Sequence, residues 1–575
     1  MKQIIAILAS TVLTATLFAQ GNPDVTLTGT GSREVEPAYR IPVAPSVLDT
    51  SIQTPVVNYP LLNLKFETET ELNKIDPASI RTKEQLSQLY HNYVKLGIGT
   101  QLMPLGEWYF DSKRSRKWNY GAHVKHLSSF GSLPDYAPSR FDRTGGLVYG
   151  ALNERKYSVR AEAHYRNQGL HYYAFPLTTY DSLGLTRDSI KQRFSDFGIG
   201  GLFKWHKKDS AALNLDVGMK YNNFASMKPS EQRADWRAKE NYFEIGAQGR
   251  YRLSSEVYGV DLAVKYNGFR YGNEDTSQWQ GIDTALILNN TIVSLSPHIT
   301  THLFNNKFKA KIGADLTLNA HNITRAHIYP IAELKYSMFN DIFIPYVGLR
   351  GGMQQNTFKS LTAENEFLRP NVELRNQNTS IDFYGGIKGS LSKRISFNIG
   401  GSYANVKDMG LFVTDTMYSP LRNRFDIIYD TVNVTTITGS ISYQLQEKLK
   451  VDAIANYYSY SAKNNSYAWN RPDLQVILRA SYNLFDKFLF NLDLDLENGR
   501  RALVYEDGPE VTQENGQYIE KLNFIADANL GVEYRYNKRI SAFVQANNIA
   551  SQRYQRWYNT PVQGFQFLGG VTFRF

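Results

Sequence analysis

Apolar and polar residues alternate with a period of two along most of the chain. At the C-terminal end, one face of the expected strand carries Val571, Phe573 and Phe575, and the other face carries Thr572 and Arg574. A period of two places the two sets on opposite faces of a sheet. An apolar outer face with a polar inner face is typical of a transmembrane β-barrel.

The same alternation recurs in residues 213–222, 488–497 and 524–535. In each segment the polar set is predicted to face the barrel lumen, because the apolar set must face lipid. The charged residues expected to line the lumen are Asp493, Asp495, Glu497, Asp527, Glu533, Arg535 and Arg574. Two interpretations of these residues are open. The acids could make the lumen selective for cations, or, more simply, they could pair with the arginines in a water-filled interior.

Short polar links alternate with longer polar loops between the expected strands. Links such as residues 207–209, 305–307 and 392–394 contrast with loops such as 359–376 and 413–429. This alternation is typical of the periplasmic turns and extracellular loops of outer-membrane barrels. Counted from Asn92 to Phe575, it predicts an all-β, antiparallel barrel of about 22 strands.

The N-terminus has the features of an export signal. Lys2 precedes an apolar stretch, residues 4–18, and Ala19 offers a cleavage site, so that residues 1–19 are predicted to be removed and the mature chain to begin at Gln20. An uncleaved anchor helix is disfavoured because the stretch is too short to span a bilayer comfortably. Residues 20–91 are interrupted by prolines and predict an extended segment, in the periplasm or in the lumen. We expect residues 20 to about 88 of this segment to occlude the lumen partly from the periplasmic side, with loops or a partner closing the rest.

Composition narrows the classes of function. The chain has no cysteine, which excludes disulfides, thiol catalysis, thiolate metal sites and a lipoprotein anchor. Its net charge of +10 fits anionic lipid head groups and lipopolysaccharide in an exported barrel, and nucleic acid is not expected. His123 and His126 point to opposite faces of one strand and cannot share an ion. No cofactor, metal site or catalytic set is predicted, and the protein is not expected to be an enzyme.

Aromatic residues are abundant, with 38 Tyr and 31 Phe. Pairs such as Tyr457-Tyr458 and Trp557-Tyr558 fit either platforms that stack on sugars or the aromatic belts of a membrane protein, and the belts are the simpler interpretation.

The closing hairpin carries a family resemblance. Residues 544–549 (VQANNI), followed by Arg553-Tyr554 and by the terminal strand 567–575 (FLGGVTFRF), resemble the C-terminal end of TonB-dependent transporters. That resemblance implies a 22-stranded outer-membrane barrel whose last strand, with Val571, Phe573 and Phe575, is read by the barrel-assembly machinery. The family also carries a folded N-terminal plug, whereas residues 20–91 are too short and too rich in proline to form one. The resemblance is therefore to a plugless relative in the outer membrane of a Gram-negative bacterium.

Two functions follow from a wide barrel without a plug. The first expectation is a non-catalytic component of an outer-membrane machine for protein assembly, secretion or surface-lipoprotein handling, with a protein partner in the outer membrane or periplasm. The alternative is a channel or transporter for a small solute such as a glycan, a peptide or a metal chelate.

Overall fold

The structure, a computed structural model, describes residues 89–113, 115–205, 213–227, 237–272, 286–505 and 511–575. The predicted signal peptide (1–19) and the segment expected to occlude the lumen (20–88) lie outside the described residues. So do the predicted turn at 207–209 and most of the predicted loops at 229–239 and 273–286. Among the described residues, no helix is long and apolar enough to cross a membrane.

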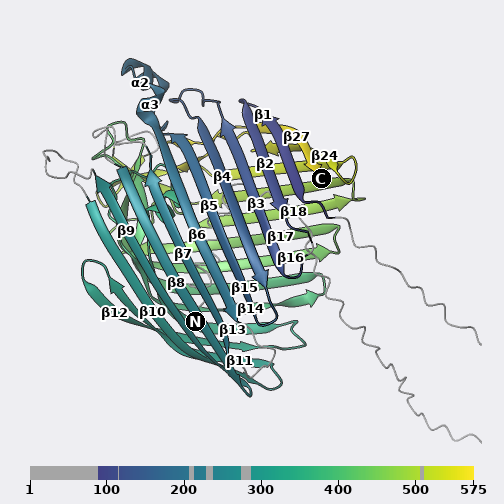
Figure 1. Cartoon of the computed structure of the whole chain (residues 1–575). Coiled ribbons are helices and arrows are strands. Elements are labelled where there is room, and N and C mark those ends of the chain that lie inside the picture. Colours follow the sequence, from purple (N-terminus) through teal and green to yellow (C-terminus); the bar gives the residue numbers. More distant parts are fainter. Residues whose placement is uncertain (1–88, 114, 206–212, 228–236, 273–285, 506–510) are drawn as a thin grey trace, which may run out of the picture. The chain divides into compact units, whose positions relative to one another are not determined.

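One antiparallel sheet of 22 strands forms the body of the protein (Figure 1). Its first half consists of β1 (Asn92–Gly99), β2 (Met103–Asp111), β3 (Trp118–Ser129), β4 (Phe141–Asn153), β5 (Tyr157–His171), β6 (Lys191–Trp205), β7 (Asn214–Ser226), β8 (Arg237–Leu253), β9 (Glu256–Gly272), β10 (Leu286–Leu303) and β11 (Phe308–Ala320). Its second half consists of β12 (Thr324–Tyr336), β13 (Ile344–Gln354), β14 (Gln377–Ser392), β15 (Ile395–Thr414), β16 (Phe425–Leu445), β17 (Leu449–Ala462), β18 (Leu474–Leu484), β19 (Phe488–Asn498), β23 (Ile525–Arg535), β24 (Ile540–Asn547) and β27 (Gln566–Arg574). The predicted number of strands is confirmed.

The sheet closes on itself because β1 pairs with β27 as well as with β2. Gly97 faces Gly570 across this closing pair, and a Cβ on Gly570 would lie only 2.0 Å from the Leu96 carbonyl oxygen. Glycine therefore permits the close approach of the first and last strands. Closure leaves no unpaired sheet edge facing lipid, which a spanning sheet requires.

Side chains alternate across the barrel wall as the sequence predicts. On β9, Val260 and Leu262 are exposed on the outer face, whereas Asp261, Lys265 and Asn267 are buried on the inner face. The apolar outer face and polar inner face are those of an outer-membrane barrel.

Small elements lie in the longer links. The β5–β6 loop carries α2 (Leu177–Ser182) and α3 (Arg187–Ile190), which Figure 1 shows beyond the ends of the strands. The β13–β14 loop carries α4 (Phe358–Glu364). The β19–β23 loop forms a three-stranded sheet of β20 (Arg501–Val504), β21 (Val511–Glu514) and β22 (Gln517–Lys521), and the β24–β27 loop contains β25 (Gln555–Trp557) and β26 (Thr560–Pro561).

Two predicted loops differ from the structure. The loop expected at 413–429 is shorter, because β15 continues to Thr414 and β16 begins at Phe425. The segment expected to be a polar loop at 359–376 contains a helix and several buried apolar residues. In both cases apolar side chains of the long loops pack against the protein at the end of the barrel that carries these loops, instead of facing solvent.

Candidate functional site: loops folded into the barrel

The β13–β14 loop, residues 355–376, is called here the crossing segment. It leaves the barrel wall at the end of β13, forms α4, and rejoins the wall at β14. Thr357 begins the helix, and its hydroxyl oxygen accepts a hydrogen bond from the Ser360 N–H at 3.0 Å. Because a side-chain oxygen satisfies a free N–H of the first turn, this short helix has a defined start.

Phe358 attaches the crossing segment to the inner face of the barrel. Its side chain is fully buried, and its ring lies 6.3 Å from that of Phe194 on β6, 5.6 Å from Phe224 on β7 and 5.4 Å from Phe269 on β9. These centroid distances fall in the range of favourable aromatic pairs. The start of α4 is therefore packed against a wall built by strands that precede it by about a hundred residues or more.

Charged side chains of the inner wall hold the first turn of α4. The buried Glu240 carboxylate on β8 accepts hydrogen bonds from the backbone N–H groups of Phe358 and Lys359, the second at 3.2 Å. The Lys359 ammonium lies 2.7 Å from a carboxylate oxygen of Asp196 on β6. Burial lowers the pKa of Lys359, and the Asp196 charge opposes that effect. Carboxylates at the beginning of a helix are favourable because its free N–H groups point toward them.

The crossing segment contacts opposite sides of the barrel. Glu366 pairs with Arg143 on β4 at 3.1 Å and accepts a hydrogen bond from Gln168 on β5. Three residues later, Arg369 pairs with Asp426 on β16 at 2.8 Å. β5 and β16 are the fifth and sixteenth strands of a ring of 22, so they stand across the lumen from each other. The crossing segment therefore bridges the lumen at its loop end.

Three other loops join the crossing segment, beginning with the β5–β6 loop, whose Tyr172 hydroxyl donates to the Leu368 carbonyl oxygen at 3.4 Å. Asn423 of the β15–β16 loop donates a hydrogen bond to the Tyr172 carbonyl oxygen at 2.8 Å. Tyr173 of the β5–β6 loop donates its hydroxyl to the Pro561 carbonyl oxygen of the β24–β27 loop, also at 2.8 Å. Burial raises the pKa of Tyr173, which keeps the hydroxyl protonated as a donor.

An apolar cluster completes this arrangement. Trp557 of the β24–β27 loop packs edge to face on Phe412 at 5.0 Å and lies 6.0 Å from Phe425. Phe412 and Phe425 belong to the same buried cluster as Phe358 and Leu368 of the crossing segment. The four loops thus form one packed layer across the loop end, which we call the loop cap.

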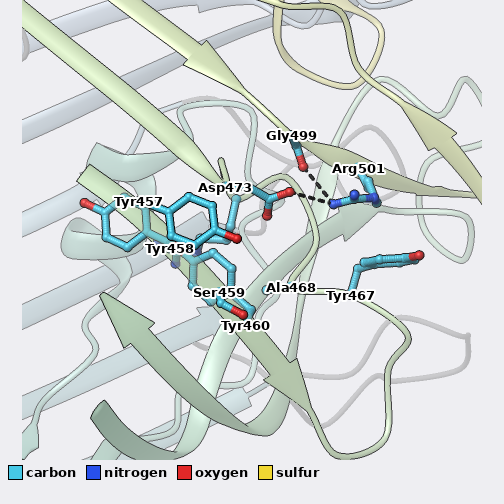
Figure 2. A pocket seen from close by; sticks show the side chains of 10 residues that line it. Tyr457, Tyr458, Ser459, Tyr460, Tyr467, Ala468, Asp473, Gly499 and Arg501 are labelled. Carbon is cyan, nitrogen blue, oxygen red and sulfur yellow. Dashed lines mark hydrogen bonds and ion pairs between the residues drawn. The ribbon is translucent and has the colours of Figure 1, made fainter. Parts of the chain in front are cut away.

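A cavity of about 190 Å³ lies beside the loop cap, between β17, the β17–β18 loop and the start of β20. Figure 2 shows Tyr458 and Tyr460 on one side, Tyr467 and Arg501 on the other, and Asp473 between them. Arg501 donates from Nη1 to Asp473 Oδ2 and to the Gly499 carbonyl oxygen, each at 3.0 Å.

The β17–β18 loop that forms one wall of this cavity is firmly held. The buried Asp430 carboxylate accepts hydrogen bonds from the backbone N–H groups and the side-chain amides of both Asn464 and Asn465, each at 2.9 Å. Trp469 in the same loop is buried and donates to the Asn465 side chain at 3.1 Å. The cavity is therefore formed before any ligand arrives.

The acids predicted to line the lumen lie on neighbouring strands, and several have partners. Asp495 on β19 stands opposite Asp527 on β23, which accepts a hydrogen bond from Tyr554 at 2.9 Å. The charged pairs are Asp493 with Arg479 at 3.6 Å, Glu497 with Arg500 at 3.8 Å, and Glu533 with Arg574 at 3.8 Å and Arg535 at 4.0 Å. Whether these charges make the lumen cation-selective or only pair with arginines stays a prediction.

The C-terminal strand closes the barrel. Val571, Phe573 and Phe575 are exposed on the outer face, and Thr572 is buried on the inner face. Their recognition by the barrel-assembly machinery stays a prediction. Among the described residues no cluster of three or more histidine and acidic side chains could hold a metal ion.

Sequence reasoning missed the crossing segment, although it carried a signal. Phe358, Leu361, Phe367, Leu368 and Val372 are buried, and so many apolar residues are unusual in a solvated loop. The polar residues between them hid this signal, because they gave the segment the overall composition of a solvated loop.

No protein-family model matches the chain, and no curated protein matches it in sequence. Solved structures do match in fold. One is the pyoverdine outer membrane receptor FpvA from Pseudomonas aeruginosa, with TM-score 0.60, 13% identity, and coverage of 86% of this chain and 79% of that one. The copper transporter OprC gives TM-score 0.58, 13% identity, and coverage of 85% and 81%. The FrpB iron transporter from Neisseria meningitidis gives TM-score 0.63, 7% identity, and coverage of 85% and 82%.

These likenesses concern the fold. They confirm the resemblance to the barrel of TonB-dependent receptors, and with the apolar outer face they place the chain in the outer membrane of a Gram-negative bacterium. The neighbours are receptors and transporters. The absence of enzymatic activity stays a prediction, as do lipopolysaccharide and the assembly machinery as partners.

Proposed function

We propose that this protein is an outer-membrane transporter for a small solute such as a glycan, a peptide or a metal chelate, and that its own loop cap gates the barrel. The observation that carries the proposal is the crossing segment, which is bound to opposite walls of the lumen. A barrel of 22 strands encloses a wide bore, and natural barrels of this size are filled.

The crossing segment and the barrel wall are held by different kinds of contact. The wall is a continuous ladder of hydrogen bonds between strands, whereas the segment is held chiefly by side chains such as Phe358, Lys359 and Glu366. A segment that lies outside that ladder can open locally while the rest of the protein stays folded. The segment can therefore leave the lumen without disturbing the barrel, as a gate requires.

A role in protein assembly, secretion or surface-lipoprotein handling was the first expectation from the sequence. No contact or surface among the described residues favours it over transport, and the fold neighbours are named as receptors and transporters. Transport is therefore the better-supported of the two functions.

The test is conductance in planar bilayers, with four forms of the purified chain. They are the intact protein, a form without residues 20–80, a form in which residues 357–374 are replaced by a Gly-Ser linker of equal length, and the form with both changes. The N-terminal deletion measures whether residues 20–80 also occlude the bore, which remains part of the proposal. Heat-modifiable migration on gels verifies that each form is a folded barrel.

We expect the intact chain to conduct little and the doubly altered form to conduct as a wide pore. If the linker form alone conducts, the loop cap is the whole gate. If both changes are needed, residues 20–80 share the occlusion. A wide pore in the intact chain would refute gating by the cap. Silence of the doubly altered form would refute transport, and a scaffold role would replace it.

A further inference from the structure

We propose that the cavity beside the loop cap is a binding site for a single neutral sugar ring, the end of a longer glycan. The proposal rests on the function proposed above, because it names the class of solute that the protein recognises. Four observations support it: the aromatic walls, the hydrogen-bonding groups around them, the charge balance and the size of the cavity.

Two tyrosines provide the stacking surface. Tyr458 and Tyr460 lie two residues apart on β17, and their rings stack at a centroid distance of 5.9 Å and an angle of 22°. Two residues apart means the same face of the strand. Asp452 lies on the same face of β17. It stands opposite Arg479 on β18, which in turn stands opposite Asp493 on β19. Because a row of charged side chains cannot face lipid, this face is the inner one. Aromatic rings bury the C–H face of a sugar while leaving its hydroxyl groups at the edge.

Hydrogen-bonding groups surround these rings. Within the part of the chain that the structure describes, the hydroxyl groups of Tyr458 and Tyr460 have no hydrogen-bond partner. In the same part of the chain, the hydrogen bonds of Arg501 use only Nη1. Opposite them, the Arg501 guanidinium lies 4.5 Å from the centre of the Tyr467 ring, so its plane is fixed. A sugar ring needs such a set of donors and acceptors around a flat apolar floor.

The charge balance favours a neutral ligand. Arg501 is paired with Asp473 at 3.0 Å, and Arg471 is paired with Glu364 of the crossing segment at 3.0 Å. An anionic chelate would find both arginines already neutralised. A cationic one would find each carboxylate already in an ion pair. Hydroxyl groups can bond to such pairs without breaking them, because each pair retains free donor and acceptor positions.

The size fits one ring. A cavity of about 190 Å³ is smaller than the ~300–1,000 Å³ of ordinary small-molecule sites. It accommodates one residue of a chain, and the remainder of the glycan extends outward. The ion pair between Arg471 and Glu364 joins this site to α4, so a ligand that displaces either side chain acts directly on the crossing segment.

The test is a printed array of oligosaccharides ending in neutral sugars: glucose, galactose, mannose, xylose, rhamnose and N-acetylglucosamine. The full chain is applied in a sugar-free amphiphile such as lauryldimethylamine oxide, because maltoside detergents would occupy the site. The variants are Tyr460→Ala, Tyr460→Phe and Arg501→Leu. Tyr505→Ala is the matched control, since Tyr505 is an exposed tyrosine at the same end outside the cavity.

We expect the intact chain and Tyr505→Ala to bind the same glycans. Tyr460→Ala should weaken binding about tenfold, through the loss of stacking and of one hydrogen bond. Tyr460→Phe should retain most of the affinity, because it keeps the ring. Heat-modifiable migration must be unchanged in all variants.

Two results would overturn the proposal: no glycan bound above background, or equal binding by Tyr460→Ala, Arg501→Leu and the intact chain. The proposed transport function fails separately. A chain that binds glycans through this cavity, and whose doubly altered form never conducts, would be a glycan-binding barrel that does not transport.

Discussion

Replacing Phe358 with alanine should release the crossing segment while leaving the barrel folded. The side chain is fully buried, and its ring contacts three aromatic rings on β6, β7 and β9. Truncation of a buried phenylalanine to alanine costs about 3–5 kcal/mol when the cavity cannot collapse. Here the cavity walls are β-strands of a closed barrel, so little collapse is expected.

This cost falls on docking of the segment and not on the wall, because Phe358 contributes nothing to the hydrogen-bond ladder between strands. At about 1.4 kcal/mol for each factor of ten, the ratio of undocked to docked segment should rise by roughly two to three and a half orders of magnitude. If the docked segment is the main barrier, channel openings that are rare in the intact chain become frequent in the variant.

Single-channel recording of the chain without residues 20–80 measures the effect, because this background removes any second occlusion. Phe485→Ala is the control, since Phe485 is 86% exposed in the β18–β19 turn. The control should conduct as its parent does. If Phe358→Ala opens no more often than the control, while hydrogen exchange shows its crossing segment to be undocked, docking of the segment does not limit conduction and the reasoning is wrong.

Three further predictions concern assembly, rigidity and pH. Deletion of Phe575 should lower the amount of folded, heat-modifiable barrel in the outer membrane and leave export across the inner membrane intact; normal levels would contradict its role. Asp430→Ala leaves two backbone N–H groups of the β17–β18 loop without their acceptor, at a cost of about 1–3 kcal/mol each, and limited proteolysis should then cleave that loop faster than in the intact chain. Burial raises the pKa of Asp415 in the β15–β16 loop. The folded loop therefore binds this proton more tightly than the unfolded chain does. The resulting stability is fully present below the unfolded pKa and is lost as pH rises through the folded pKa. Asp415→Asn keeps an acceptor for the Met417 and Tyr418 N–H groups, so exchange protection of the loop, corrected for intrinsic rates, should no longer fall as pH rises above about 4, the ordinary pKa of an aspartate.

The barrel was predictable from the sequence because its physics is local. A period of two fixes which side chains share a face, and lipid outside dictates which face is apolar. Val571 and Phe573 on the outer face, with Thr572 on the inner face, follow from position alone. The number of strands follows as well, since each link is visible as a break in the alternation.

The loop cap was not predictable in this way. Its contacts join residues that are far apart in sequence, such as Glu366 with Arg143 and Tyr173 with Pro561. No periodicity within a loop shows whether the loop points into solvent or into the lumen. That choice depends on the width of the bore and on which inner-face side chains meet there, for example Asp196 and Glu240 under α4.

The candidate sugar site illustrates the same division. The sequence marked Tyr457-Tyr458 as either a sugar platform or part of an aromatic belt, and alternation alone places the two rings on opposite faces. Only the tertiary structure shows that Tyr458 stacks with Tyr460 instead, and that Asp473 of the β17–β18 loop and Arg501 of the β19–β23 loop face them. The sequence by itself determined the wall of the barrel, because each strand follows a local rule. What closes the lumen and what lines the cavities beside it was decided by the tertiary structure, because those contacts exist only once distant strands have been brought around the same lumen.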